Sequence, residues 1–273
     1  MEKVQLVPLW SVAGGVAGLV VLTAMGHLSP LGWIAGIAYL VVSDVLLARG
    51  LHASGLTRFG PANTATLLRS TLVGLVTALV ATGLFAAGAG GAGPGETGFG
   101  GGLVGASTQE VRAALLVGLA APALALDAVD GWIARRTGTT SDLGARFDME
   151  VDAFLLLVLG LAVAPALGWW VVAIGALRYA FVAAGWIWPW MNQTLPPRYW
   201  RKVVTAVAGI ALVVAATELL PLWVAQALVG VALALLLESF GRDVIWLVRA
   251  HRRAAARTPV WAAVRRSAGE PGA

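Results

Sequence analysis

The sequence predicts an all-α, polytopic membrane protein. Of its 273 residues, 59% are hydrophobic and only 12% are charged, and the mean hydropathy is +0.82. Soluble domains carry about 25% charged residues, roughly twice as many. Apolar runs of about 20 residues, the length that lets a helix cross a bilayer, recur along the chain. These runs are continuous and do not alternate with polar residues, so they favour helices over a β-barrel.

Eight apolar segments predict eight membrane-spanning helices. They cover residues 8–26, 31–48, 64–87, 111–135, 145–166, 169–190, 200–218 and 221–247. Arg and Lys gather after the second, fourth, sixth and eighth segments. Because cytoplasmic loops are enriched in these residues, we expect both termini to be cytoplasmic. The first segment lacks a small-residue cleavage site, so we expect it to remain as a span and not to leave as a signal peptide.

Composition excludes several kinds of site. There is no cysteine, and the three histidines are scattered, so thiolate and zinc sites are not expected. The net charge of +5 fits cytoplasmic loops and anionic headgroups, and we expect no nucleic-acid partner.

The Gly-rich stretch 87–106 follows no strand and holds no basic residue, which indicates an external linker and not a nucleotide loop. Residues 249–273 form a basic cytoplasmic tail, either an interfacial helix or disordered.

The chemistry concentrates between Asp127 and Asp152, where six of the fourteen acidic residues lie. Asp127 and Asp130 are spaced i, i+3, and Asp148 and Asp152 are spaced i, i+4, so each pair shares one helical face. The fourth and fifth spans form an antiparallel hairpin that brings the four carboxylates to a similar depth. Uncompensated charges there are costly, and hard divalent cations such as Mg²⁺, Mn²⁺ or Ca²⁺ would resolve this cost. Two such ions could bind a diphosphate.

Other residues of the stretch suit a phosphate ligand. Gly131 and Gly144 leave room for a ligand close to the backbone, and Arg135 can pair with phosphate oxygens. Asp142 and Glu150 fall off the face shared by the other acids, so we expect them to be solvated.

The stretch fits the pattern D-x2-D-G-x2-A-R-x8-G-x3-D-x3-D. The matching positions are Asp127, Asp130, Gly131, Ala134, Arg135, Gly144, Asp148 and Asp152. This pattern resembles the signature of the CDP-alcohol phosphotransferase (CDP-alcohol phosphatidyltransferase) family. The resemblance implies a six-helix catalytic core over residues 59–248, preceded by two additional transmembrane helices over 1–58. It also implies transfer of a substituted phosphate group from a CDP-linked donor to an alcohol, with release of CMP.

The resemblance also implies roles for individual residues. Asp127, Asp130 and Asp148 would bind two Mg²⁺ or Mn²⁺ ions, and Asp152 would be the general base and also contact metal. The CDP moiety would be lined by Gly131, Ala134, Arg135 and Gly144. The segment Gly60–Arg69 resembles the family's P-N-x-x-T-x-x-R segment, with one inserted residue, so Asn63, Thr66 and Arg69 would also contact CDP. The alternative is that Asn63 is a helix N-cap and Arg69 a positive-inside residue.

The acceptor is less well defined. Arg178 lies midway along the sixth span, where an Arg is costly and usually functional. It would reach an acidic neighbour or the phosphate of a phosphorylated acceptor. Arg146, Arg201 and Lys202 supply further cytoplasmic positive charge. We therefore expect a phosphorylated polyol such as glycerol 3-phosphate or inositol 1-phosphate as acceptor.

The predicted protein is a phospholipid-synthesising enzyme of the cell membrane, with CDP-diacylglycerol as donor and its active site at the cytoplasmic face. Family members are often homodimers, so a homodimer is an alternative to a single copy. Two other functions remain open. A membrane prenyltransferase also uses Asp-rich pairs, although these are normally far apart in sequence. A transporter with a carboxylate ion site predicts an inverted repeat and acids near mid-bilayer, and the sequence shows neither.

Overall fold

The computed structural model describes residues 2–54, 61–88, 102–137, 142–193 and 199–268, and it places side chains over 11–49, 66–87, 109–127, 147–193 and 200–254. Within these ranges all regular structure is helical. The elements are α1 (Glu2–Ala24), α2 (Pro30–Ser54), α3 (Pro61–Gly88), α4 (Gly102–Thr137), α5 (Asp142–Leu167), the 3₁₀ turn η1 (Trp169–Val172), α6 (Ala173–Ile187), the 3₁₀ turn η2 (Pro189–Asn192), α7 (Tyr199–Ala216) and α8 (Leu222–Ala268).

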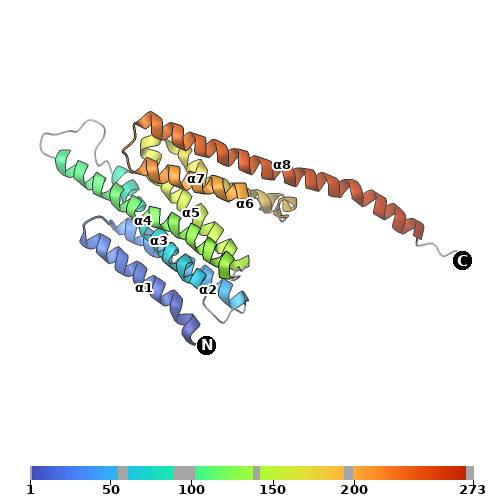
Figure 1. The fold of residues 1–273 in the computed structure, drawn as a ribbon, viewed down its shortest axis with the longest axis horizontal. Helices are drawn as coiled ribbons and strands as arrows, with labels where there is room; N and C mark the ends of the chain where they lie inside the picture. Colours follow the sequence, from blue (N-terminus) through green and yellow to red (C-terminus); the bar gives the residue numbers. More distant parts are fainter. Residues whose placement is uncertain (1, 55–60, 89–101, 138–141, 194–198, 269–273) are drawn as a thin grey trace.

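The helices confirm the predicted fold class. Each of the eight apolar segments falls in a helical element, and the sixth combines η1, α6 and η2. Among the residues whose side chains are placed, six helices are long and apolar enough to cross a membrane, and Ser11–Ala24 is a shorter apolar helix. The protein is therefore a multi-pass membrane protein. The first residues of α1 and the last residues of α8 project from the same end of the bundle (Figure 1).

The helix α3 lies at the centre of the packing. It packs against α1, α2, α4 and α5. The largest apolar core joins α3, α4, α5, α7 and α8 through buried residues such as Val76, Ala120, Leu159, Leu212 and Val229. In Figure 1, α1 lies at one edge of the bundle and α8 at the other. Side chains on α3 can therefore meet side chains from both sides of the bundle.

The contact between α5 and α6 depends on a glycine. An added Cβ at Gly175 would lie 2.3 Å from the Cα of Leu157 on α5. Small residues let membrane helices approach closely and gain van der Waals contact. Gly175 therefore sets the distance between α5 and α6, which both carry charged residues of the candidate site.

The helix α8 extends beyond the expected eighth span. It runs for 47 residues to Ala268, whereas the sequence predicted the end of the span near residue 247. At 1.5 Å per residue it is about 70 Å long, more than twice the roughly 30 Å of a hydrocarbon core. Its last turns project past the rest of the bundle in Figure 1. The first part of the basic tail is thus a continuation of α8, and the disordered alternative is wrong up to Ala268.

Candidate active site

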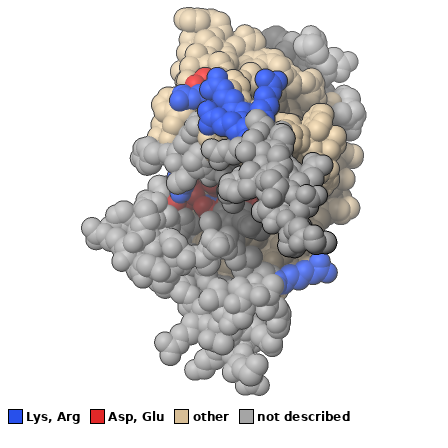
Figure 2. Space-filling view, turned by 90° about the vertical axis from the view of Figure 1, so that its right-hand side faces the viewer, with Lys and Arg blue, Asp and Glu red and all other residues tan. Residues whose placement is uncertain are grey.

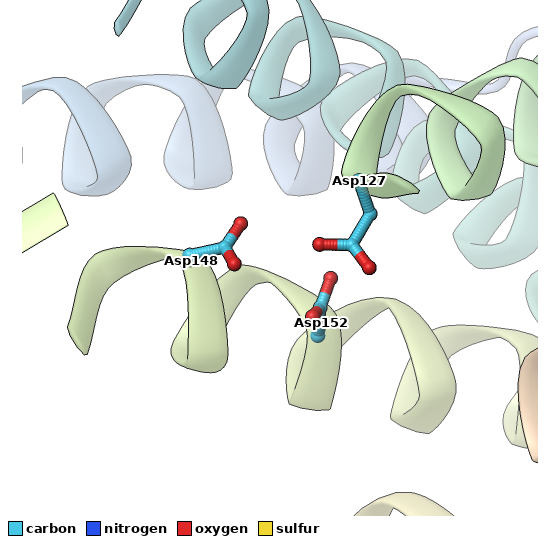
Figure 3. Close-up of side chains that lie close together, drawn as sticks. All are labelled: Asp127, Asp148 and Asp152. Atoms are coloured by element: carbon cyan, nitrogen blue, oxygen red, sulfur yellow. The ribbon is translucent and has the colours of Figure 1, made fainter. Parts of the chain in front are cut away.

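Three aspartates from two helices converge in the structure. Asp127 of α4 and Asp148 and Asp152 of α5 each offer a carboxylate oxygen, and these oxygens all lie within 4.8 Å of one another. Figure 3 shows the three side chains pointing toward a common space between the two helices. Their side chains are 39%, 30% and 22% exposed, respectively, so the cluster is partly buried but open to a ligand.

Helical spacing explains this arrangement. Asp148 and Asp152 are one turn apart near the start of α5, so both project from the same face. Asp127 lies ten residues before the end of α4, which runs to Thr137. The next helix starts at Asp142, so the chain reverses direction and returns the α5 acids to the level of Asp127. The side chain of Asp130, the fourth predicted carboxylate, lies outside the described residues.

A buried arginine from α3 touches all three carboxylates. The side chain of Arg69 is 0% exposed. Its Nη1 lies 2.7 Å from Oδ1 of Asp127, and its Nη2 pairs with the carboxylate of Asp148 and lies 3.5 Å from Oδ1 of Asp152. Nη2 also donates to the backbone carbonyl of Asp148, at 3.2 Å. An isolated buried charge is strongly unfavourable, and here three anions compensate it.

This position of Arg69 was missed at the sequence level. We expected it to contact CDP or to be a positive-inside residue, but the structure places it at the centre of the carboxylate cluster. The signal in the sequence is an Arg flanked by Leu67, Leu68 and the apolar remainder of a span. A cation in such a setting needs anionic partners, and the chain has few acids to offer. Thr66 lies one turn earlier on α3 and is half-buried.

A second ion pair lies beside the cluster. Arg178 of α6 donates from Nη2 to Oε1 of Glu150 on α5, at 2.5 Å. Of the two predicted roles of Arg178, the structure therefore shows the acidic neighbour. Glu150 is exposed, with 47% of its side chain accessible, as expected for an acid off the shared face, and it also pairs with Arg178. The pair joins α6 to the turn of α5 that carries Asp148 and Asp152.

The remaining predicted cations lie at the start of α7. Arg201 pairs with Asp243 of α8 at 3.4 Å, and Asp243 is only 6% exposed. Lys202 is exposed, and its charge interacts with Asp148. On α8, Glu238 and Arg242 form an i, i+4 ion pair at 2.9 Å. In Figure 2, which looks onto this side of the molecule, acidic side chains lie recessed in the surface and Lys and Arg side chains gather elsewhere on the same face.

The structure describes the other predicted site residues at the level of the backbone. Their side chains lie outside the described residues: Asn63, Gly131, Ala134, Arg135, Gly144 and Arg146. The backbone puts Asn63 on α3, the residues from 131 to 135 on the last turns of α4, and Gly144 and Arg146 on the first turns of α5.

Apolar helices around a recessed group of carboxylates and a buried guanidinium define an integral membrane protein with a polar interior site. The family model described as CDP-alcohol phosphatidyltransferase matches residues 59–237, from α3 into α8. Comparison with curated proteins and with solved structures finds no match. Because the matched segment covers well over half of the chain and contains the whole carboxylate cluster, the protein belongs to the CDP-alcohol phosphatidyltransferase family. It is thus a member of a family of membrane transferases that act in phospholipid biosynthesis.

Proposed function

We propose that the protein transfers the phosphatidyl group of CDP-diacylglycerol to an alcohol and releases CMP. The observation that carries this proposal is the convergence of Asp127, Asp148 and Asp152 around a space inside the segment that the family model matches. A lipid donor suits a site among membrane helices, because its acyl chains can remain in the bilayer while its diphosphate reaches the polar interior. We further propose that this site faces the cytoplasm in the cell membrane.

The carboxylate oxygens of the cluster are suitable ligands for a divalent cation. Three carboxylate oxygens within 4.8 Å supply the hard oxygen ligands that Mg²⁺ and Mn²⁺ prefer. We propose that Asp127, Asp130, Asp148 and Asp152 hold two such ions. Bound there, the ions would neutralise the diphosphate and the charge that develops during its displacement. Arg69, which already balances the same carboxylates, would hold them in place and limit their mutual repulsion.

In the proposed reaction, Asp152 accepts the proton of the acceptor hydroxyl. The hydroxyl oxygen then forms a bond to the phosphorus that carries diacylglycerol, and the bond from this phosphorus to the oxygen of CMP breaks. The products are the phosphatidyl ester and CMP, with the proton on Asp152. Asp152 is the least exposed of the three acids, at 22%, and it lies one turn deeper along α5 than Asp148, which supports assigning it a separate role. Gly131, Ala134, Arg135, Gly144, Asn63 and Thr66 are proposed to line the CDP moiety.

For the acceptor we propose a phosphorylated polyol such as glycerol 3-phosphate or inositol 1-phosphate. Arg178 is 26% exposed, and its partner Glu150 lies between Asp148 and Asp152 in sequence. An acceptor phosphate could therefore replace the carboxylate of Glu150 as the partner of Arg178 while its hydroxyl approaches Asp152. Lys202, Arg201 and Arg146 would add positive charge around this phosphate.

The test uses purified protein in lipid nanodiscs with CDP-diacylglycerol, Mg²⁺ and a panel of alcohols, and it follows the release of CMP. We expect turnover with a phosphorylated polyol and none after addition of EDTA. Replacing Asp127, Asp148 or Asp152 by Asn should abolish turnover, whereas Glu238→Gln on α8 is the matched control and should retain it. Near-normal turnover in the three Asn variants would refute the assignment. With the phosphatidyl ester product present, absence of metal-dependent exchange of labelled CMP into CDP-diacylglycerol would instead favour a carboxylate-based transporter.

A further inference from the structure

The helix α2 lies outside the segment that the family model matches, yet it contacts the helices that build the carboxylate site. The match begins at residue 59, whereas α2 ends at Ser54. The helix packs against α3, which carries Arg69, and against α5, which carries Asp148 and Asp152. It contacts both helices at two places along its length, one on each side of Asp148 and Asp152.

The first contact is made by Tyr39. Its ring stacks on that of Phe154 of α5, with centroids 4.7 Å apart and an interplanar angle of 22°. Ser70 of α3 donates from Oγ to the Tyr39 hydroxyl, at 3.5 Å. Phe154 lies two residues after Asp152, and Ser70 directly follows Arg69. One side chain of α2 thus bridges the two helices next to the ion pair between Arg69 and Asp152.

The second contact is made by Leu47. It is 7% exposed and packs with Leu67 of α3 and Phe147 of α5. Leu67 lies two residues before Arg69, and Phe147 directly precedes Asp148. The same three helices therefore meet again on the other side of the cluster.

The two contacts have matched spacing. Phe147 and Phe154 are seven residues apart, close to two helical turns or about 10 Å, so they lie on one face of α5. Tyr39 and Leu47 are eight residues apart, or about 12 Å along α2. The contacts run in opposite order along the two helices, as antiparallel neighbours require. A sliding or rotation of α5 against α3 would break at least one of them.

We propose that α2 is a positioning element of the active site, in which Tyr39 and Leu47 hold α3 and α5 in the register that brings Arg69 to Asp148 and Asp152. Tyr39 acts through Phe154 and Ser70 and is a positioning residue. The proposal rests on the proposed function for its kinetic readout. It also assigns a role to α2, namely to fix the geometry of a site formed by helices that follow it in the chain.

The experiment compares Tyr39→Ala, Tyr39→Phe and Leu47→Ala in the full-length protein, in nanodiscs. Val42→Ala is the matched control, because Val42 lies on the same helix and is 58% exposed. We measure kcat and KM for CDP-diacylglycerol by CMP release. Binding of Mn²⁺ is measured separately by electron paramagnetic resonance without substrate. A displacement of about 1 Å at a catalytic group can lower the rate about 100-fold, so we expect a fall in kcat of about 10- to 100-fold for Tyr39→Ala.

The folded variants are expected to differ in kcat and in Mn²⁺ affinity, and a purely structural role would not change these properties of the folded protein. Tyr39→Ala and Leu47→Ala should lower kcat and weaken Mn²⁺ binding, with KM for the donor little changed. Tyr39→Phe keeps the stacked ring and should restore most of both properties. Val42→Ala should behave as wild type. If the folded Tyr39→Ala and Leu47→Ala proteins retain wild-type kcat and Mn²⁺ affinity, α2 does not position the site.

Different results would refute the proposed function and the role of α2. A wild-type protein that releases no CMP with any donor and acceptor would refute the proposed function, while the comparison of Mn²⁺ binding would still test the role of α2. If Tyr39→Ala does not fold, Leu47→Ala makes the same test from the other side of the cluster. Wild-type turnover together with unchanged turnover in both variants would refute the role of α2 alone.

Discussion

Nη1 of Arg69 lies 2.7 Å from Oδ1 of Asp127, although the two residues are 58 positions apart in the chain. The same guanidinium reaches Asp148 and Asp152, so one cation from α3 is shared among three anions from α4 and α5. The three carboxylates on α4 and α5 therefore depend for their charge balance on α3, the helix that precedes them in the chain.

Loss of the cation should destabilise the protein. Arg69→Leu leaves three close carboxylates without their buried partner. Breaking a buried pair costs about 3–5 kcal/mol, and we expect the lower end of that range because the carboxylates are partly exposed. Thermal unfolding in detergent measures the effect. Addition of Mg²⁺ should recover part of the lost stability, since a divalent cation can take over the role of the missing charge.

Arg69→Lys is the matched variant for the same position. It keeps the charge but offers a compact ammonium in place of a planar fork, so it cannot hold two carboxylates in fixed directions. We expect most of the stability to remain and CMP release to fall at least 10-fold. Equal stability losses in the Lys and Leu variants would contradict the role of charge at this position.

Substitution of Asp152 and substitution of Asp127 by Asn should abolish turnover for different reasons. If Asp152 is the base, Asp152→Asn removes the proton acceptor but leaves a carbonyl oxygen as a weak ligand, so turnover should vanish while Mn²⁺ binding is only moderately weakened. Asp127→Asn should reduce both. Electron paramagnetic resonance of Mn²⁺ together with CMP release separates the two effects. Identical loss of Mn²⁺ binding in both variants would assign Asp152 to the ligands alone.

The pair of Arg178 and Glu150 should control the acceptor and not the donor. Arg178→Gln removes the proposed phosphate partner, and we expect KM for the phosphorylated acceptor to rise about 10-fold or more, as expected for loss of a charge-assisted hydrogen bond of roughly 1.5–3 kcal/mol. KM for CDP-diacylglycerol should change little. Glu150→Gln frees Arg178 from its carboxylate and should lower KM for the acceptor. A rise in both KM values for Arg178→Gln would show that the pair serves the packing of α5 and α6.

Gly175 provides a test of the packing between α5 and α6. Gly175→Ala places a methyl group 2.3 Å from the backbone of Leu157, so α6 must move away from α5. Overpacking of this kind costs about 1–3 kcal/mol. Gly230→Ala on α8 is the control, because nothing lies within 4 Å of its added Cβ. The difference in melting temperature between the two variants measures the effect, and equal melting temperatures would contradict close packing at Gly175.

The sequence predicts the helices and the acidic cluster well because both depend on local patterns. Apolar length determines where a helix crosses the bilayer, and i, i+4 spacing puts Asp148 and Asp152 on one face. The partner of Arg69 depends instead on how α3 is rotated against α4 and α5, which is decided by packing among distant residues. The same holds for Tyr39, whose contact with Phe154 joins residues that no local pattern connects. For residues 249–268 the sequence left a helix and disorder as alternatives, because Arg and Ala support a helix without the apolar run that marks a span.

The buried position of Arg69 bears on how the protein is made. Its partners Asp127 and Asp148 follow it by 58 and 79 residues, so at about 5–20 residues per second the ribosome supplies them several seconds after Arg69 itself. During that interval α3 must keep its cation at the membrane surface or in contact with water. The helix can settle into its final depth only when α4 and α5 arrive, which makes the assembly of this centre a late event in membrane insertion.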